Sequence, residues 1–263
     1  MNCIKEVVDI LDLLYKHGWD ERNGGNLSYL VSKEQVEVLC DINKVTRTFT
    51  YPFDLSPLVG RFLVITGTGK YFKNAEKEPD VTLGIVRVMD AHTLGLLWGF
   101  ADGGRPTSEA PTHLKCHMER LQMDANHKVV MHCHPDHVIA MTHIHELDEN
   151  SWALDLWKMQ TESIVVFPEG IGFLPWIICG AEEIGEATAY KMKQYRSVVW
   201  AQHGLFATGS TIDETFGLIE TIEKAAKIYM TILGHPIKQS ISNEQLRLLA
   251  KTFNVTYKKG VID

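Results

Sequence analysis

The chain of 263 residues carries a formal net charge of −7 at neutral pH, with 45% hydrophobic and 22% charged residues. This composition is ordinary for a globular protein with one large core, so we expect residues 1–263 to form a single domain. An acidic chain without a cluster of lysine and arginine is not expected to bind nucleic acid, and no apolar stretch is long enough to cross a membrane.

Five cysteines are scattered along the chain, and none of them forms a C-x-x-C pair. An odd, scattered set argues against a disulfide framework and favours a reducing compartment. The N-terminal segment lacks the basic start and the small-residue cleavage site of a signal peptide. We therefore expect a cytoplasmic protein.

The first half of the chain predicts one helix followed mainly by strands. Apolar residues recur at helical spacing over residues 3–17, and Gly18 supplies a C-terminal stop. Several later segments are short and apolar, which is typical of strands. In chain order we expect a helix over 3–17, strands over 27–31, 36–40 and 61–66, irregular chain over 41–60, and strands over 83–89 and 93–98.

Two glycine-rich turns interrupt these elements, at residues 18–26 and 67–70. Paired glycines let consecutive backbone N–H groups turn inward around an anion, and Asn23 and Asn26 could add side-chain donors. Neither turn has the full spacing of a Walker A or G-x-G-x-x-G motif, so each is a weak phosphate signal by itself. For residues 18–26 alone, a tight turn without a ligand is the simpler interpretation.

The second half predicts more helices than strands. Residues 107–111 open a helix that runs to about residue 122, with Thr107 or Ser108 as its N-cap. Glu109 would then lie at the positive end of the helix dipole, where acidic residues are favoured without any function. Beyond this helix we expect strands over 129–134, 163–167 and 197–201, helices over 135–145, 147–160, 181–195, 212–233 and 242–252, and a loop over 168–179.

The order of these elements indicates an α/β protein. Helices and strands alternate, but several strands are adjacent pairs, which favours a mixed sheet with helices on both faces over a purely parallel sheet. Ligands in open α/β sheets bind beyond the carboxyl ends of strands. The residues that follow the predicted strands over 129–134 and 197–201 are therefore candidates for a site.

Three histidines lie at or just past such strand ends. His132 and His134 would project to one face of a strand, while Cys133 between them points to the other. The pair alone fits a metal site and ordinary hydrogen-bonded histidines about equally, and His203 at a comparable strand end favours the metal. Three histidines leave a coordination position of zinc open for water or substrate, as catalytic sites do. Co²⁺, Mn²⁺ and Fe²⁺ stay compatible with imidazole ligands.

The spacing of these histidines fits a hydratase, a hydrolase, a metal-dependent aldolase or a purely structural site. Nine further histidines remain, and most lie on expected helices or loops, where we assign them no role. Among them are His17, His92, His113, His117 and His127.

Six sequence blocks, in the same order over about residues 18–250, together resemble the class II aldolase family. The H-x-H pattern by itself is unspecific, but the set of six is highly specific. The resemblance implies a three-layer α/β/α sandwich with a central mixed, largely antiparallel sheet. The blocks are GWDERNGGNL (18–27), ITGTGKYF (65–72), PTSEAPTH (106–113), VVMHCH (129–134), TESIVVFPEGIGFLPW (161–176) and QHGLF (202–206).

The activity that this resemblance implies is a zinc-dependent, reversible retro-aldol cleavage of L-rhamnulose 1-phosphate to dihydroxyacetone phosphate and L-lactaldehyde, in the breakdown of L-rhamnose. Zn²⁺, one per subunit, would stabilise the enediolate that the broken C–C bond leaves, and a glutamate would act as acid and base. The resemblance also implies a homotetramer whose active sites lie near the boundaries between subunits.

The resemblance also implies roles for individual residues. His132, His134 and His203 match the family's zinc ligands, and Glu109 matches its catalytic glutamate. Glu162 matches a second glutamate that assists proton transfer at the aldehyde end, from a neighbouring subunit. The positions that match the surroundings of the substrate phosphate are Asn23, Asn26, Thr68, Thr107 and Ser108.

Two alternatives stay open. A related zinc-dependent sugar-phosphate aldolase, such as a fuculose-phosphate aldolase, or a pentulose-phosphate 4-epimerase would share the zinc and phosphate groups and differ in the aldehyde pocket. A non-catalytic protein in which zinc only holds the fold is the second alternative. Structural zinc sites usually have four ligands and many cysteines, which argues against it.

Overall fold

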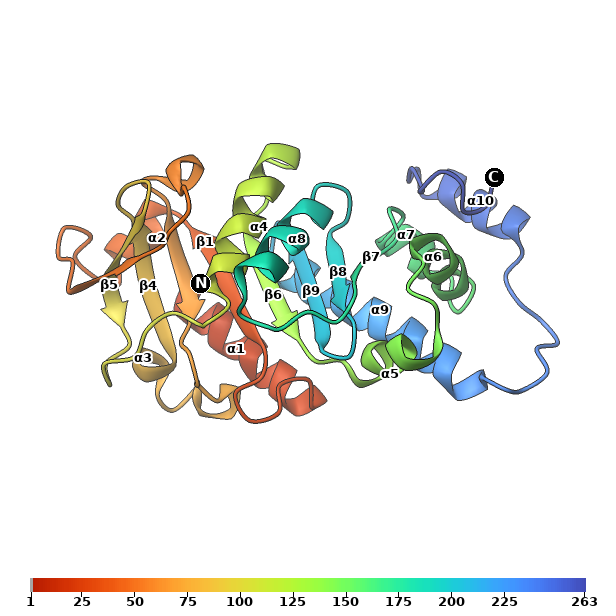
Figure 1. The fold of residues 1–263 in the computed structure, drawn as a ribbon, viewed down its shortest axis with the longest axis horizontal. Helices are drawn as coiled ribbons and strands as arrows, with labels where there is room; N and C mark the ends of the chain where they lie inside the picture. Colours follow the sequence, from red (N-terminus) through yellow and green to blue (C-terminus); the bar gives the residue numbers. More distant parts are fainter. Residues whose placement is uncertain (1) are drawn as a thin grey trace.

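The computed structural model describes residues 2–263, in which nine strands form one sheet with helices on both faces (Figure 1). The strand order is β2-β5-β4-β3-β1-β6-β9-β8-β7, and every neighbouring pair is antiparallel except β7–β8. The predicted α/β/α sandwich with a mixed, largely antiparallel sheet is confirmed. The strands are β1 (Asn26–Val31), β2 (Arg47–Thr50), β3 (Phe62–Thr66), β4 (Leu83–Val88), β5 (Thr93–Gly99), β6 (Val129–Cys133), β7 (Gly172–Leu174), β8 (Ser197–Trp200) and β9 (Gly204–Gly209).

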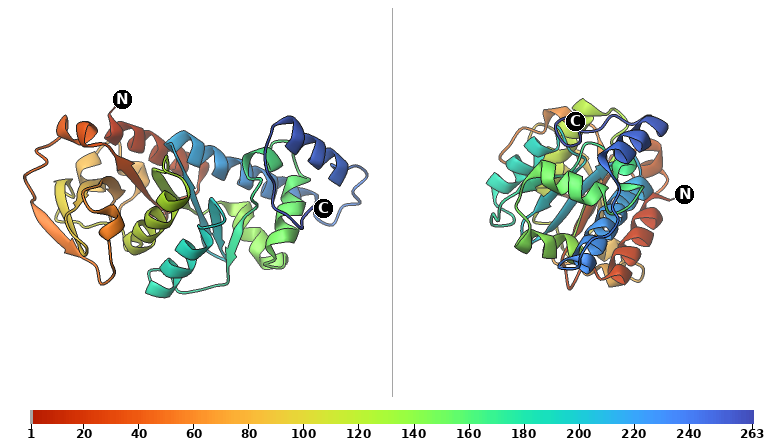
Figure 2. Two further views of the ribbon diagram at one scale, coloured as in Figure 1. Left: turned by 90° about the horizontal axis from the view of Figure 1, so that it is seen from above. Right: turned by 90° about the vertical axis from the view of Figure 1, so that its right-hand side faces the viewer.

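Two helical layers cover opposite faces of the sheet, with α1 and α9 on one face and α4 and α8 on the other (Figure 2). No helix in residues 2–263 combines the length and apolar character needed to cross a bilayer. The α-helices are α1 (Cys3–His17), α2 (Lys33–Glu37), α3 (Pro79–Thr82), α4 (Ala110–Met123), α5 (Asp136–Ile144), α6 (Glu149–Trp157), α7 (Ser163–Val166), α8 (Glu182–Lys191), α9 (Ile212–Ile232) and α10 (Asn243–Thr252), and the 3-10 helices are η1 (Ser56–Leu58) and η2 (Phe72–Asn74).

The central strand β6 divides its side chains between the two layers. Met131 and Cys133 pack into the core shared with α1 and α9, whereas Val130 packs into the core shared with α8. Because side chains alternate along a strand, His132 points to the same face as Val130. Cys133 therefore points away from His132, as predicted.

The centre of the sheet brings several element ends together. Asn26 at the start of β1 pairs with His132 near the end of β6, and Cys133 pairs with Leu205 at the start of β9. The first turn of α4 lies at this same end, because the side chains of Asn26 and Glu109 are hydrogen-bonded. One end of the sheet thus collects residues from β1, β6, β9 and α4.

Two predicted strands are helical instead. Residues 36–40 overlap α2, which Ser32 and Gln35 begin with a reciprocal capping box. Residues 163–167 overlap α7, although isoleucine and valine favour strands. The fully buried Ile164 packs there into the main core, so tertiary packing outweighs local propensity.

Three strands were not predicted. β2 lies within the segment 41–60 that we expected to be irregular, β7 lies within the expected loop 168–179, and β9 directly follows His203. β2 is an edge strand with alternating half-buried and exposed side chains, and β7 has three residues. Because β2 and β7 are short strands at the two edges of the sheet, their sequence signal is weak. β9 is a central, fully buried strand that begins and ends with glycine, a residue that is depleted in strands.

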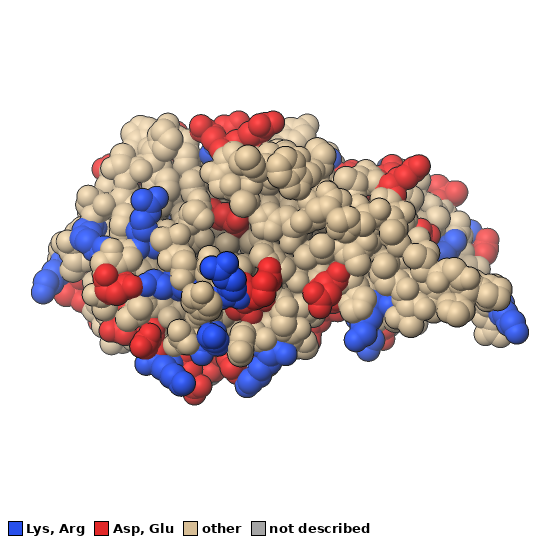
Figure 3. Space-filling view, turned by 60° about the horizontal axis from the view of Figure 1, so that its bottom comes forward, with Lys and Arg blue, Asp and Glu red and all other residues tan. Residues whose placement is uncertain are grey.

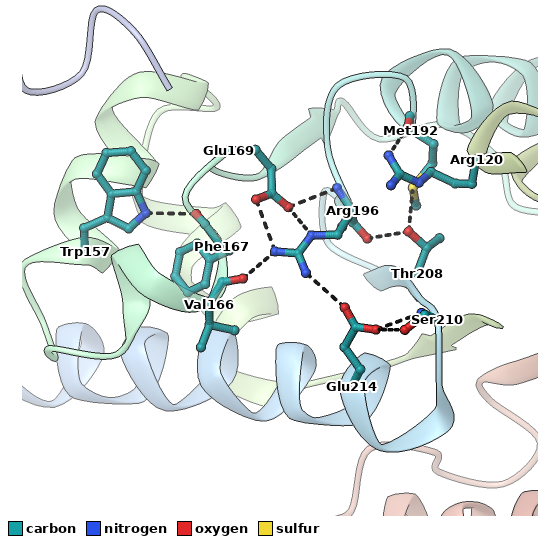
Figure 4. A network of polar contacts seen from close by, with 10 residues as sticks. All are labelled: Arg120, Trp157, Val166, Phe167, Glu169, Met192, Arg196, Thr208, Ser210 and Glu214. Atoms are coloured by element: carbon teal, nitrogen blue, oxygen red, sulfur yellow. Dashed lines mark hydrogen bonds and ion pairs between the residues drawn. The ribbon is translucent and has the colours of Figure 1, made fainter. Parts of the chain in front are cut away.

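Arg196, directly before β8, is hydrogen-bonded to α7, to the loop after it and to α9 (Figure 4). Its Nε donates a 2.8 Å hydrogen bond to Glu169 Oε1, its Nη1 donates to Glu214 Oε1 at 3.4 Å, and its Nη2 donates to Val166 O. Glu169 lies in the loop after α7, and Glu214 lies in the first turn of α9. These charge-assisted hydrogen bonds hold the loop after α7 and the start of α9 next to β8. They stabilise a part of the fold that does not include the strand ends at the centre of the sheet.

Candidate metal centre

Three histidine side chains converge where β6 and β8 end. His132 is in β6, His134 follows that strand, and His203 lies in the turn between β8 and β9. One ring nitrogen of each lies within 4.8 Å of the others, and the three ring centroids are 5.1 Å apart in every pair. This spacing is compatible with three ligands around one metal ion.

The outer contacts of two of these rings leave their inner nitrogens free. His132 Nδ1 lies 3.1 Å from Leu205 O, and His134 Nδ1 lies 3.0 Å from Glu21 Oε1. A carbonyl and a carboxylate can only accept, so both Nδ1 atoms carry hydrogen and Nε2 is the nitrogen of each ring that can offer a lone pair to a metal. These two Nε2 atoms are buried without a hydrogen-bond partner, which is costly unless a ligand binds them. The donor set fits a divalent transition metal such as zinc.

Burial keeps two of these imidazoles in the uncharged form that binds metal. It lowers the pKa of His132 well below its usual value and lowers the pKa of His203 to about 4, and the neighbouring His134 adds to both shifts. The metal centre is thus ready to accept a cation at neutral pH without first releasing protons from these rings.

Two glycines give the rings their space. A Cβ atom on Gly24 would lie 2.7 Å from His134 Cε1, and one on Gly204 would lie 2.9 Å from His132 Cε1. Both distances are too short for non-bonded carbon atoms. The glycine turn at residues 18–26 is therefore shaped by the histidine cluster as well as by any anion.

Glu109 lies beside the histidines. Its Oε2 atom is 3.8 Å from His132 Nε2 and accepts a 2.8 Å hydrogen bond from Asn26 Nδ2. Burial raises the pKa of Glu109 to about 7, against the opposing effect of the bond from Asn26. A carboxyl group with such a pKa can take up and release protons near neutral pH.

The prediction of Thr107 or Ser108 as the N-cap of α4 is wrong. Glu109 occupies the N-cap position, and its side chain makes no capping bond because it is directed to Asn26 instead. Thr107 Oγ1 accepts a 3.3 Å hydrogen bond from Glu109 N, just before the helix. The helix start thus orients a carboxylate toward the histidines.

The residues expected around the phosphate lie on neighbouring segments. The turn 67–70 is joined to the loop before α4, because Thr68 N donates to Arg105 O and Thr107 N donates to Thr66 O. This brings the second glycine turn beside the Thr107 segment, at the end of the sheet where β1 begins. Of the five predicted residues, Asn26 and Thr107 are buried, Thr68 is half-buried, and Asn23 and Ser108 are exposed.

The face that carries these residues has no single basic patch. In Figure 3, which turns this end of the molecule forward, lysine and arginine side chains are interspersed with aspartate and glutamate. Thr107 and Ser108 line a cavity of about 190 Å³ together with Arg105. None of Asn23, Asn26 and Thr68 lines this cavity, so it does not join the five residues predicted around the phosphate.

Glu162 lies apart from the metal centre. It is an exposed residue directly before α7, beyond the β7 edge of the sheet (Figure 1), and it lines a groove of about 550 Å³ with Glu220 and Lys224. Within residues 2–263 no hydrogen bond or ion pair joins Glu162 to the histidine cluster. A single chain does not bring this predicted site residue to the others.

A buried row of polar side chains leads away from the metal centre, and sequence reasoning missed it. Asn26 Oδ1 is hydrogen-bonded to His113 Nε2, and His113 Nδ1 lies 2.7 Å from Ser28 Oγ. Ser28 Oγ lies 2.8 Å from His117 Nε2, and His117 Nδ1 lies 2.9 Å from His127 Nε2. The available signal was the four-residue spacing of His113 and His117, which places both on one face of a helix.

Known proteins resemble this chain over nearly its whole length. The family model described as Class II Aldolase and Adducin N-terminal domain matches residues 5–230. A rhamnulose-1-phosphate aldolase of Listeria monocytogenes is 48% identical over 262 residues, which cover 99% of this chain and 96% of the relative. A rhamnulose-1-phosphate aldolase of Enterococcus faecalis is 45% identical over 262 residues, which cover 99% and 94%.

A solved structure supports the same relationship at the level of the fold. The crystal structure of a sugar-phosphate aldolase from Thermotoga maritima superposes with a TM-score of 0.76 at 27% sequence identity. The match covers 90% of this chain and 97% of that one.

Proposed function

The chain belongs to the class II aldolase family and is a lyase, and we propose that it cleaves L-rhamnulose 1-phosphate reversibly to dihydroxyacetone phosphate and L-lactaldehyde. The proposed substrate is supported by the name of two relatives that are 48% and 45% identical over 99% of the chain. The observation that carries the chemistry is the convergence of partnerless imidazole nitrogens beside a buried glutamate.

We propose that His132, His134 and His203 hold one Zn²⁺ per chain through their inner nitrogens. A bound zinc ion would supply a Lewis acid that stabilises the negative charge developing on the substrate when the C–C bond breaks. The chain contributes the uncharged rings, the hydrogen bonds to Leu205 O and Glu21 that fix their orientation, and the open side toward Glu109.

Glu109 is the proposed acid and base. In the cleavage direction it would deliver a proton to the carbon next to the carbonyl group, and in the synthesis direction it would remove that proton. Asn26 holds the carboxylate through a 2.8 Å hydrogen bond and so limits its rotation. A bound zinc ion would stabilise the developing negative charge, which is the role of a lysine Schiff base in other aldolases, so no such lysine is needed on this chain.

The phosphate group is proposed to lie among Asn23, Asn26, Thr68, Thr107 and Ser108. The Asn26 amide donates one N–H to Glu109 and can offer its other N–H to a phosphate oxygen. Binding energy from the phosphate would hold the reacting carbons in place, which contributes to turnover although the phosphate does not react.

We also propose that residues 1–263 form a single catalytic domain. One continuous sheet takes its strands from Asn26 to Gly209, which supports this proposal. We propose a homotetramer in which Glu162 assists at the aldehyde end of a neighbouring subunit, and light scattering would test it. The proposed location is the cytoplasm, because a charged sugar phosphate does not pass through a bilayer unaided.

A substrate panel tests the proposed activity. The zinc-loaded protein is incubated with L-rhamnulose 1-phosphate, L-fuculose 1-phosphate and a pentulose 5-phosphate, and the release of dihydroxyacetone phosphate is coupled to NADH oxidation. We expect the highest kcat/KM with L-rhamnulose 1-phosphate. A higher value with L-fuculose 1-phosphate, or epimerisation of the pentulose phosphate without cleavage, would assign the chain to the corresponding relative instead.

A further inference from the structure

The row of polar side chains behind Glu109 is buried along its whole length. Ser28, His113 and His117 are 0% exposed, and His127 is 2% exposed. Ser28 lies on β1 and faces α4, which supplies His113 and His117 one turn apart. Five buried polar groups in one continuous row are expensive to desolvate unless every hydrogen bond is satisfied.

The carboxylate of Glu109 determines the direction of the first two bonds in this row. In its ionised form Glu109 can only accept, and Asn26 then turns its N–H₂ group toward Glu109 and its Oδ1 toward His113. The amide oxygen is also an acceptor, so His113 must carry its hydrogen on Nε2. A neutral ring with hydrogen on Nε2 has a lone pair on Nδ1.

The remaining hydrogen bonds of the row then have only one possible direction. Ser28 Oγ donates to the lone pair on His113 Nδ1 and therefore accepts from His117 Nε2–H. His117 Nδ1 is then an acceptor, and His127 donates to it through Nε2–H. From His127 to Asn26, every donor points toward the carboxylate.

The hydrogen bonds of the row require His113 and His117 to be uncharged, because each of these rings must supply one N–H donor and one lone pair, and they also fit an uncharged His127. Burial lowers the pKa of His113 and of His127 to about 3, and it lowers the pKa of His117 well below its usual value. At neutral pH the rings are uncharged, and their orientation is set by hydrogen bonding alone.

We propose that His113 is a positioning residue for Glu109. Its Nε2–H holds the Asn26 amide with the N–H₂ group against the carboxylate, and Ser28, His117 and His127 keep His113 in the tautomer that does so. The row acts on the carboxylate through Asn26 and does not touch the substrate. This inference rests on the proposed role of Glu109 in the retro-aldol reaction.

Two substitutions of His113 separate positioning from packing. The terminal amide of glutamine reaches the place of Nε2, so His113→Gln keeps a donor to Asn26, whereas the shorter His113→Asn places its amide near Nδ1 and loses that donor. We expect kcat within about fivefold of wild type for His113→Gln and about 10–100-fold lower for His113→Asn. Zinc content should stay unchanged in both variants. KM should stay unchanged in His113→Gln, and in His113→Asn, where the rotated Asn26 amide also leaves the phosphate, the rise in KM should be smaller than the fall in kcat.

The control is His92→Asn, which makes the same replacement at an exposed position where His92 Nδ1 contacts Phe53 O. It should retain the wild-type kcat. Equal losses of kcat in His113→Gln and His113→Asn, or a rise in KM with kcat unchanged, would overturn the positioning role. If His113→Asn does not fold, Ser28→Ala decides. We expect kcat to fall by a larger factor than KM rises, at constant zinc content, and an unchanged kcat contradicts the proposal.

A crystal structure of the zinc-loaded His113→Asn variant tests the inference independently of any substrate. We expect the Asn26 amide to be rotated and the Glu109 carboxylate to have left its place beside Asn26. If the wild-type protein cleaves no sugar phosphate but this displacement is seen, the proposed function fails and the positioning stands. If Glu109 and Asn26 keep their places, the positioning fails whatever the activity.

Discussion

Two clusters of three histidines lie on the same face of the sheet and differ in what their nitrogens contact. In the strand-end cluster, formed by His132, His134 and His203, inner nitrogens face one another, and two of them have no hydrogen-bond partner. In the helix cluster, formed by His113, His117 and His127, each link of the row joins a donor to an acceptor.

The partners of the ring nitrogens distinguish a metal centre from a structural network. Both clusters are largely buried, and burial favours the neutral form of their rings. Buried lone pairs that converge without hydrogen-bond donors are unfavourable unless a cation binds them. A row of alternating donors and acceptors creates none, and it instead transmits orientation from one side chain to the next.

The largest effect should come from removing one ring of the strand-end cluster. His203→Ala is expected to lose its zinc and to reduce cleavage at least about 10³-fold, since two imidazoles bind the ion weakly and charge stabilisation is lost. Zinc content measured by mass spectrometry and cleavage rate measured on the same sample check this. His117→Gln serves as the contrast and should keep its zinc; loss of zinc there would erase the distinction between the clusters.

The next effect should come from the carboxylate between the clusters. Glu109→Gln keeps the size of the side chain and removes its ability to exchange a proton. We expect turnover to fall about 10²–10⁴-fold while the zinc content and the melting temperature stay near wild type. Turnover close to that of the wild type would show that Glu109 is only the N-cap residue of α4.

Acid should destabilise the helix cluster. The pKa of His113 and of His127 is about 3 in the folded chain against about 6.5 when unfolded, so the unfolded state binds more protons below pH 6.5. Stability is therefore fully present above pH 6.5 and is lost as the pH falls. From His113 and His127 we expect a loss of about 2 kcal/mol in unfolding free energy between pH 6 and 5, and His117, whose pKa burial also lowers, adds to this loss.

Urea unfolding of the zinc-free protein at several pH values measures this slope. The double replacement His117→Gln and His127→Gln should make this slope smaller, while His113, His132 and His203 keep their contributions to it. A slope that is unchanged by the replacement would mean that these rings are protonated in the folded chain.

The smallest effect should come from the phosphate contacts. Thr68→Ala and Asn23→Ala each remove one neutral donor to a charged group, and we expect KM to rise about tenfold with little change in kcat. Steady-state kinetics over a range of substrate concentrations measures the split. Unchanged KM in both variants would place the phosphate elsewhere.

The two clusters also show what could be predicted from the amino-acid sequence. His132 and His134 stand out because an apolar strand fixes which side chains share a face, and His203 follows a second apolar strand. The family resemblance added Glu109, which a helix start alone does not distinguish from an ordinary acidic residue.

The helix cluster could not be predicted, because its contacts depend on tertiary register. The spacing of His113 and His117 shows only that both lie on one helix face. That Ser28 lies between them requires β1 to pair with β6 in the observed register, Ser28 opposite Val130, and α4 to cross that face. Likewise, the helical state of residues 163–167 depends on packing that local propensity does not contain.

Zinc content and cleavage rate, measured together on one preparation, test whether the strand-end histidines act by holding a metal. The protein as purified, after chelation, and after re-addition of Zn²⁺ is assayed with L-rhamnulose 1-phosphate. We predict one zinc per chain and full activity, then loss of both, then recovery of both. Full cleavage by the metal-stripped protein would contradict the central claim that the strand-end histidines act by holding a metal.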